Sequence, residues 1–300
     1  MPETTRVRAA TRWLFAPATG EVPRAQAVAA AALRILVGLM WLYNVSWKTA
    51  PDFGEKAGDR LYKFTSYAVS DPVLPPYSWV VEHLVLPNFR PFGWAVLVLE
   101  TALAVLLLTG AWVRLVAALG AVQSLAIGLT VAAAPEEWPW SYLLMVGVHG
   151  LLLFSSAGRV LAVDAVRAGI GRTRTLGRFW GLLTVLMGLF SVALSLGDPL
   201  AAKGPAVRVA VLEVSLGEFN LVGGLVLVAA GGLLLLAARP GASWAAWAAA
   251  GLAALGALSL HAQLGFTDPL LGGSTTSAAY LFAVALIGTV LARAPERVPA

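Results

Sequence analysis

Residues 92–134 read FGWAVLVLETALAVLLLTGAWVRLVAALGAVQSLAIGLTVAAA, and this stretch decides the fold. The run is too long for one crossing of a bilayer, because about 20 helical residues already span the hydrocarbon core. It is interrupted by Thr109, Gly110 and Arg114, a combination that predicts a tight turn. The stretch therefore predicts two antiparallel membrane helices, at about 92–109 and 114–133.

The same apolar pattern recurs along the chain, with prolines only outside the long runs or at their first turn. It predicts spans at about 25–47, 92–109, 114–133, 140–157, 179–197, 219–238, 243–263 and 276–292. In the sixth span, Gly223, Gly224, Gly231 and Gly232 predict close contact with a neighbouring helix. The predicted fold class is an all-α integral membrane protein with about eight transmembrane helices.

Composition supports a lipid environment and excludes several functions. Hydrophobic residues make up 59% of the 300 residues and charged residues 12%, about half the usual charged share of a soluble domain. The net charge of +5 is better explained by arginines that set membrane topology than by nucleic-acid binding. The chain has no cysteine, and its three histidines lie far apart in the sequence, so we expect no metal site. His83 and His261 could meet at the outer membrane interface and ligate a haem, but we expect none.

Orientation follows from the basic residues. With the N-terminus inside, thirteen of them, Arg293 and Arg297 included, fall in cytoplasmic segments and seven in outer ones. This bias predicts a multi-pass plasma-membrane protein with both termini in the cytoplasm. In the long outer loop, Phe53, Ala57, Leu61, Phe64 and Ala68 recur at helical spacing and predict an amphipathic helix; Trp79, His83 and Leu84 predict a second, shorter one.

The polar segment near residues 158–178 divides the chain into two sets of four spans. The predicted organisation is a cytoplasmic segment 1–24, a four-helix domain 25–166 with the outer loop 48–91, a cytoplasmic linker 167–178 and a second four-helix domain 179–293. Each set begins in the cytoplasm, has a longer first outer loop and a short second turn. This pattern predicts a parallel internal repeat.

Four polar residues inside the first four spans need an explanation: Arg34, Glu100, Gln123 and His149, one in each span. Counted at 1.5 Å per residue, all four lie roughly 13–15 Å from the cytoplasmic edge. A charge at this depth costs roughly 2.5–3.5 kcal/mol, which a charge-assisted pair between Arg34 and Glu100 would offset. The spacing therefore predicts one polar layer, with Arg34 hydrogen-bonded to Glu100. It is either a structural ion pair or a site that binds or protonates a ligand.

The second set carries no charged residue near mid-span. We interpret this set as a scaffold. Its polar residues include Ser191, Ser195, Ser259, His261 and Gln263.

Several loose motifs in residues 25–166 occur in a recognisable order. They are Leu33-Arg34-Ile35 with Gly38 and Leu39, Trp47-Lys48, Glu100 followed by Leu106-Leu107-Leu108-Thr109-Gly110 and Arg114, and Gly158-Arg159 with Asp164. On these residues the first half resembles the DoxX/DoxD family of small four-helix membrane proteins. The outer loop with proline and tryptophan is similar to the DoxD type, the small subunit of thiosulfate:quinone oxidoreductase.

The resemblance implies a DoxX-like four-helix bundle and a quinone as cofactor. Under it, Arg34, Glu100 and His149 are the candidate catalytic residues, and Gln123, Trp47 and Lys48 the candidate ligand-binding residues. The implied function is a quinone-linked membrane oxidoreductase subunit, in the lipid bilayer with other membrane or extracytoplasmic subunits. Two alternatives remain open: a non-enzymatic partner or assembly subunit, and a small-solute transporter.

Overall fold

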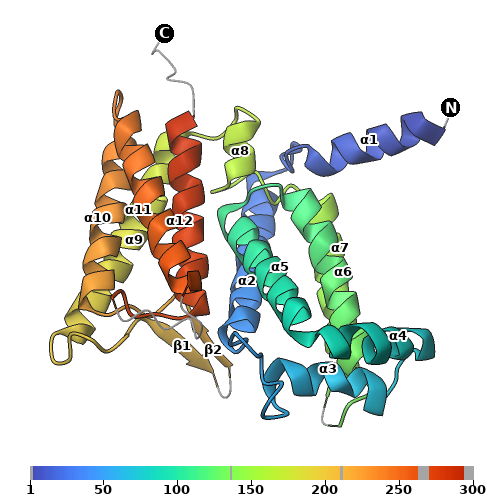
Figure 1. Ribbon diagram of the computed structural model, residues 1–300. Coiled ribbons are helices and arrows are strands. Elements are labelled where there is room, and N and C mark those ends of the chain that lie inside the picture. The colour runs from blue at the N-terminus through green and yellow to red at the C-terminus, as the bar shows by residue number, and fades with distance from the viewer. Residues whose placement is uncertain (1–2, 136, 210–211, 263–269, 294–300) are drawn as a thin grey trace.

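The computed structural model describes residues 3–135, 137–209, 212–262 and 270–293, and these residues are mainly helical (Figure 1). Its long apolar helices are α2 (Arg24–Ser46), α5 (Phe89–Thr109), α6 (Val113–Val131), α7 (Pro139–Phe154), α9 (Thr173–Ser195), α10 (Leu221–Ala237), α11 (Ser243–Ala262) and α12 (Thr275–Arg293). Each corresponds to one predicted span. The largest difference is at α9, which begins at Thr173 inside the predicted linker; a short helix, α8 (Val163–Arg167), precedes it. Gln263 and Arg297 lie outside the described residues.

Among the described residues, six helices are long and apolar enough to cross a membrane. The other two, α7 and α10, have 16 and 17 residues and are equally apolar but shorter. We call the end where α2 begins and α12 ends the termini side, and the opposite end the hairpin side. On the termini side, α1 (Glu3–Phe15), which the sequence did not predict, projects away from the bundle (Figure 1).

The turn between α5 and α6 forms as predicted. Gly110 ends α5 in the left-handed region at φ +68°, where a side chain would be strained. A Cβ at this position would also lie 2.1 Å from the Arg34 guanidinium nitrogen Nη1. Glycine is therefore required here for the turn and for the approach of Arg34.

Helix α12 joins the two helix sets. It packs against α11 and α9 within its own set and against α2 and α5 of the first set, and Thr275 Oγ1 donates a hydrogen bond to the Val45 carbonyl at 3.0 Å. Within the second set, α9 and α10 approach closely: a Cβ on Gly188 would lie 2.6 Å from the Gly224 carbonyl oxygen, and one on Gly181 would lie 3.0 Å from that of Gly231. The predicted contact with a neighbouring helix is confirmed for Gly224 and Gly231. Gly223 instead approaches the Leu271 carbonyl in the turn before α12, and a Cβ on Gly232 would have no neighbour within 4 Å.

The loop on the hairpin side of α2 forms a small cap. Its helices are α3 (Arg60–Ser70) and α4 (Pro75–Val80), and α4 continues through a π turn (Val81–Val85) and a 3₁₀ turn (Leu86–Asn88) into α5. The prediction of a helix that begins at Phe53 is wrong. Phe53 lies in a turn at φ +52°, because Pro51 and the glycines at 54 and 58 break the helical pattern. Phe53 is fully buried and packs edge-on against Trp94, so its apolar character serves the core of the cap.

The loop between α9 and α10 contains a β-hairpin, so the all-α prediction is wrong for this segment. Strand β1 (Ala206–Val209) pairs antiparallel with β2 (Leu212–Ser215). The sequence around it, AVRV followed by LEVS, alternates apolar and polar residues in part, which is the pattern of a half-exposed strand. The first long loop of one set is thus helical and that of the other is a β-hairpin, so the internal repeat stays a prediction.

Candidate intramembrane site

Three buried polar side chains follow one another at intervals of seven residues along α2 and just beyond its end. Arg34, Trp41 and Lys48 are 0%, 0% and 2% exposed, and Lys48 lies two residues beyond Ser46, the last residue of the helix. Seven helical residues make almost two turns, so Arg34 and Trp41 lie on the same side of α2 and about 10 Å apart along its axis. Each of the three contacts a different part of the bundle.

At the termini side, Arg34 binds backbone carbonyl groups. Its Nη1 donates to the Ala157 oxygen at 3.0 Å and its Nη2 to the Leu161 oxygen at 3.1 Å. The predicted hydrogen bond between Arg34 and Glu100 is therefore wrong. Side chains on a helix point toward its N-terminus, and arginine is long enough to carry its charge away from its own Cα. The Arg34 guanidinium consequently reaches the loops on the termini side.

Asp164 organises the same end of the bundle. Its buried carboxylate accepts hydrogen bonds from the backbone N–H groups of Trp112 and Val113, both at 3.0 Å, and of Ala18 at 3.3 Å. It also accepts one from Arg167 Nη1 at 2.7 Å. A carboxylate at the start of α6 satisfies free N–H groups and interacts favourably with the helix dipole. The sequence indicated Asp164 only as part of a motif, and its capping role comes from the structure.

In the middle of the first set, Glu100 is held between two other candidate residues. Lys48 Nζ lies 2.5 Å from Glu100 Oε2, and Gln123 Nε2 donates to Glu100 Oε1 at 3.2 Å. Lys48 Nζ also donates to the Asn44 carbonyl at 2.9 Å and lies 3.9 Å from the centre of the Trp47 ring. We call Lys48, Glu100 and Gln123 the Lys–Glu–Gln cluster. Both charged members are almost completely buried, with 2% and 1% exposure.

His149 lies apart from this cluster. Trp41 Nε1–H donates to His149 Nε2 at 3.0 Å, and His149 Nδ1 is 2.8 Å from the Met145 carbonyl. These two partners require a proton on Nδ1 and a lone pair on Nε2, which is a neutral imidazole. The ring fits against α6 only because residue 120 is glycine; a Cβ there would lie 2.2 Å from Nε2.

The structure thus brings together four of the six candidate residues, Trp47, Lys48, Glu100 and Gln123, and separates Arg34 and His149 from them. The prediction of one polar layer is wrong: the polar side chains form three successive contacts along α2. Sequence reasoning missed Trp41, although its seven-residue spacing from Arg34 and from Lys48 was a usable signal.

Within the described ranges, no three His, Asp or Glu side chains gather in a way that could hold a metal ion. His83 stacks on Trp79, and His261 stacks on Phe282. No family model matches the chain, and neither a curated protein nor a solved structure is significantly similar to it.

Proposed function

We propose that this chain is a quinone-linked membrane subunit of the DoxX/DoxD type, with all eight apolar helices crossing the plasma membrane and the termini side in the cytoplasm. The Lys–Glu–Gln cluster carries the proposal. A buried ion pair within a membrane helix bundle is costly, and ionisable residues at such depth generally serve ligand binding or proton transfer. The family resemblance includes Lys48 and Glu100, and the membrane-depth argument singles out Glu100 and Gln123, so Glu100 is supported by both.

Quinone reduction takes up two electrons and two protons for each quinone. We assign proton transfer to Glu100, whose carboxylate is oriented by Gln123 and balanced by the Lys48 ammonium. Electrons would come from a redox partner subunit. Arg34 and His149 have only structural roles in this proposal, because their polar groups bond to carbonyls and to Trp41.

A non-enzymatic assembly subunit is the second candidate. The contacts of Arg34, His149 and Asp164 favour it, since all three stabilise the bundle internally. A transporter of the broken-helix type is less well supported: α2, α5, α6 and α7 each run as one continuous α-helix, and the π and 3₁₀ turns lie before α5 begins.

Orientation is tested by labelling introduced cysteines, which is direct because the natural chain has none. Ala57 and Ala168 are exposed alanines on the hairpin side and the termini side, respectively. In intact cells, a membrane-impermeant maleimide is expected to label Ala57→Cys and to spare Ala168→Cys until the membrane is permeabilised. Labelling of Ala168→Cys from outside would reverse the proposed orientation.

The proton-transfer role is tested with both charges of the cluster removed together, so that neither is left alone in the bundle. The double variant Lys48→Met with Glu100→Gln is expected to fold and to assemble, but to reduce a short-chain quinone at least about 100-fold more slowly in isolated membranes, the usual scale of general acid–base catalysis. The matched control neutralises the exposed pair Arg90 and Glu55, whose atoms lie 2.9 Å apart, and should keep the parent rate. A parent rate in the Lys48/Glu100 variant would refute the role of the cluster and support the assembly subunit.

A further inference from the structure

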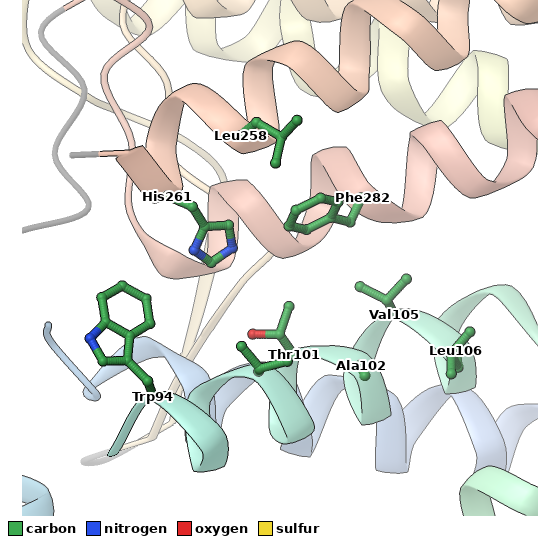
Figure 2. Close-up of a pocket in the computed structure, with 9 residues that line it drawn as sticks. Trp94, Thr101, Ala102, Val105, Leu106, Leu258, His261 and Phe282 are labelled. Atoms are coloured by element: carbon green, nitrogen blue, oxygen red, sulfur yellow. The ribbon is translucent and has the colours of Figure 1, made fainter. Parts of the chain in front are cut away.

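A groove with a cavity volume of about 480 Å³ lies where the two helix sets meet. Helix α5 provides one wall and α11 and α12 the other (Figure 2). The lining residues are Trp94, Val98, Thr101, Ala102, Val105, Leu106, Leu258, His261 and Phe282. The volume is within the range of small-molecule sites, which are mostly apolar with a few polar groups in defined places.

Thr101 is the polar group that points to a ligand. Its side chain is 7% exposed and lines the groove, and its buried hydroxyl oxygen has no hydrogen-bond partner. By contrast, the buried hydroxyl groups of Thr109 on α5 and Ser124 on α6 bond to a carbonyl one turn earlier, at Val105 and Gly120, both at 2.7 Å. Ser191 on α9 also has a buried hydroxyl without a partner, but it does not line the groove. A buried hydroxyl without a partner costs free energy. An acceptor atom of a ligand in the groove would remove this cost.

The lining of the groove is almost entirely apolar, and the Thr101 hydroxyl and the two nitrogen-containing rings are grouped at one end. In Figure 2 the Thr101 oxygen lies on the same side as the rings of Trp94 and His261, while Val105 and Leu106 extend along α5 away from them. The His261 ring stacks on Phe282 with 5.4 Å between ring centres, so flat aromatic surface is concentrated near Thr101. None of the lining residues is Asp, Glu, Lys or Arg, so the lining suits an uncharged ligand better than the charged head group of a phospholipid.

We propose that this groove binds an uncharged ring with a carbonyl acceptor and an apolar chain, the chemistry of a prenylated quinone. The Thr101 hydroxyl donates to the ring carbonyl, Trp94 and His261 flank the ring, and the chain follows Val105 and Leu106 toward the termini side. The choice of quinone rests on the proposed function, but the binding geometry does not involve the Lys–Glu–Gln cluster. Glu100 and Thr101 are neighbours on α5 with side chains about 100° apart around the helix, so a quinone in the groove lies on a different face of α5 from the Lys–Glu–Gln cluster. The groove is therefore a binding position separate from the place where Glu100 transfers protons.

The test measures binding alone, with the full chain in phosphatidylcholine nanodiscs and no electron donor. The probe is a decyl-chain quinone carrying a photoreactive azide, and decylbenzene is the competitor without an acceptor. Photolabelling is expected in residues 94–106, and Thr101→Val, which keeps the side-chain shape but removes the hydroxyl, should weaken quinone binding about tenfold without changing decylbenzene binding. Thr101→Ser should bind quinone as the parent does, unlike Thr101→Val, because serine keeps the hydroxyl.

A second pair of variants tests the location of the site. Val98 lines the groove and Val122 lies on α6 outside it, and both are strongly exposed, at 59% and 66%. Val98→Trp should fill the groove and abolish specific labelling, whereas Val122→Trp should keep it. Parent affinity in Val98→Trp would overturn the groove as the site, and parent affinity in Thr101→Val would overturn the assignment of the hydroxyl. No turnover is measured here, so these results are independent of the Lys48/Glu100 rate experiment. If the parent chain binds quinone in the groove but does not reduce it, the groove proposal stands and only the proposed function is contradicted.

Discussion

Replacing either Lys48 or Glu100 alone with leucine is expected to destabilise the chain by about 3–5 kcal/mol, because each single change leaves one uncompensated charge in a nearly water-free bundle. The double variant Lys48→Leu with Glu100→Leu should lose much less, since two buried charges are then replaced by apolar side chains of similar size. Thermal unfolding in mild detergent, followed for the parent, the two single variants and the double variant, measures the coupling between the two sites.

The exposed pair Arg90 and Glu55 supplies the control for this cycle. Its side chains are 55% and 34% exposed, so water already solvates each charge and single substitutions should change the unfolding temperature very little. If Lys48→Leu and Glu100→Leu were as mild as these controls, or if their effects simply added, the two charges would not form a coupled buried pair.

The second large effect is expected at Asp164. Asp164→Ala removes the acceptor for three backbone N–H groups and for Arg167, and it also removes the negative charge nearest to these buried donors. Unsatisfied buried donors cost about 1–3 kcal/mol each, although such costs are not additive. We therefore expect a loss of at least about 3 kcal/mol, measured by thermal unfolding, together with faster hydrogen exchange at the start of α6.

Two further variants separate charge from geometry at this position. Asp164→Asn keeps one acceptor oxygen, so it should retain part of the stability that Asp164→Ala loses. Asp198→Ala removes an exposed aspartate on the hairpin side and should leave unfolding unchanged. Equal stability of Asp164→Ala and the parent would show that the α6 start does not depend on this carboxylate.

The candidate site was only partly predictable. Glu100 and Gln123 were recognised because a polar residue deep in an apolar run is conspicuous in any sequence. Lys48 was placed in an outer loop by its position after the first span, and its link to Glu100 could not be read from the sequence. Its amine reaches Glu100 because it folds back along α2, where it also binds the Asn44 carbonyl. The depth of a Cα atom does not fix the depth of a long, flexible side chain.

Arg34 is a second case in which the depth of the Cα atom does not give the depth of the charged group, and here the side chain points toward the termini side. Its Cα was counted to the same depth as that of Glu100, but the side chain points back toward the start of α2 and binds the carbonyls of Ala157 and Leu161. For His149, the membrane depth of its Cα atom was less informative than the helices that face it. Its hydrogen-bond donor Trp41 is on α2, and the space for its ring is left by Gly120 on α6.

The sequence by itself determined the apolar helices and the turn at Gly110, because backbone hydrogen bonds within an apolar segment are satisfied locally and glycine adopts the left-handed conformation without strain. Only the tertiary structure decided which polar groups pair and where a groove forms. Thr101 and His261 are far apart in the sequence and line one groove only because α12 brings the second helix set against α2 and α5. Hydrophobicity places a side chain in the membrane but does not distinguish a lipid neighbour from a helix neighbour, and that choice depends on how whole helices pack.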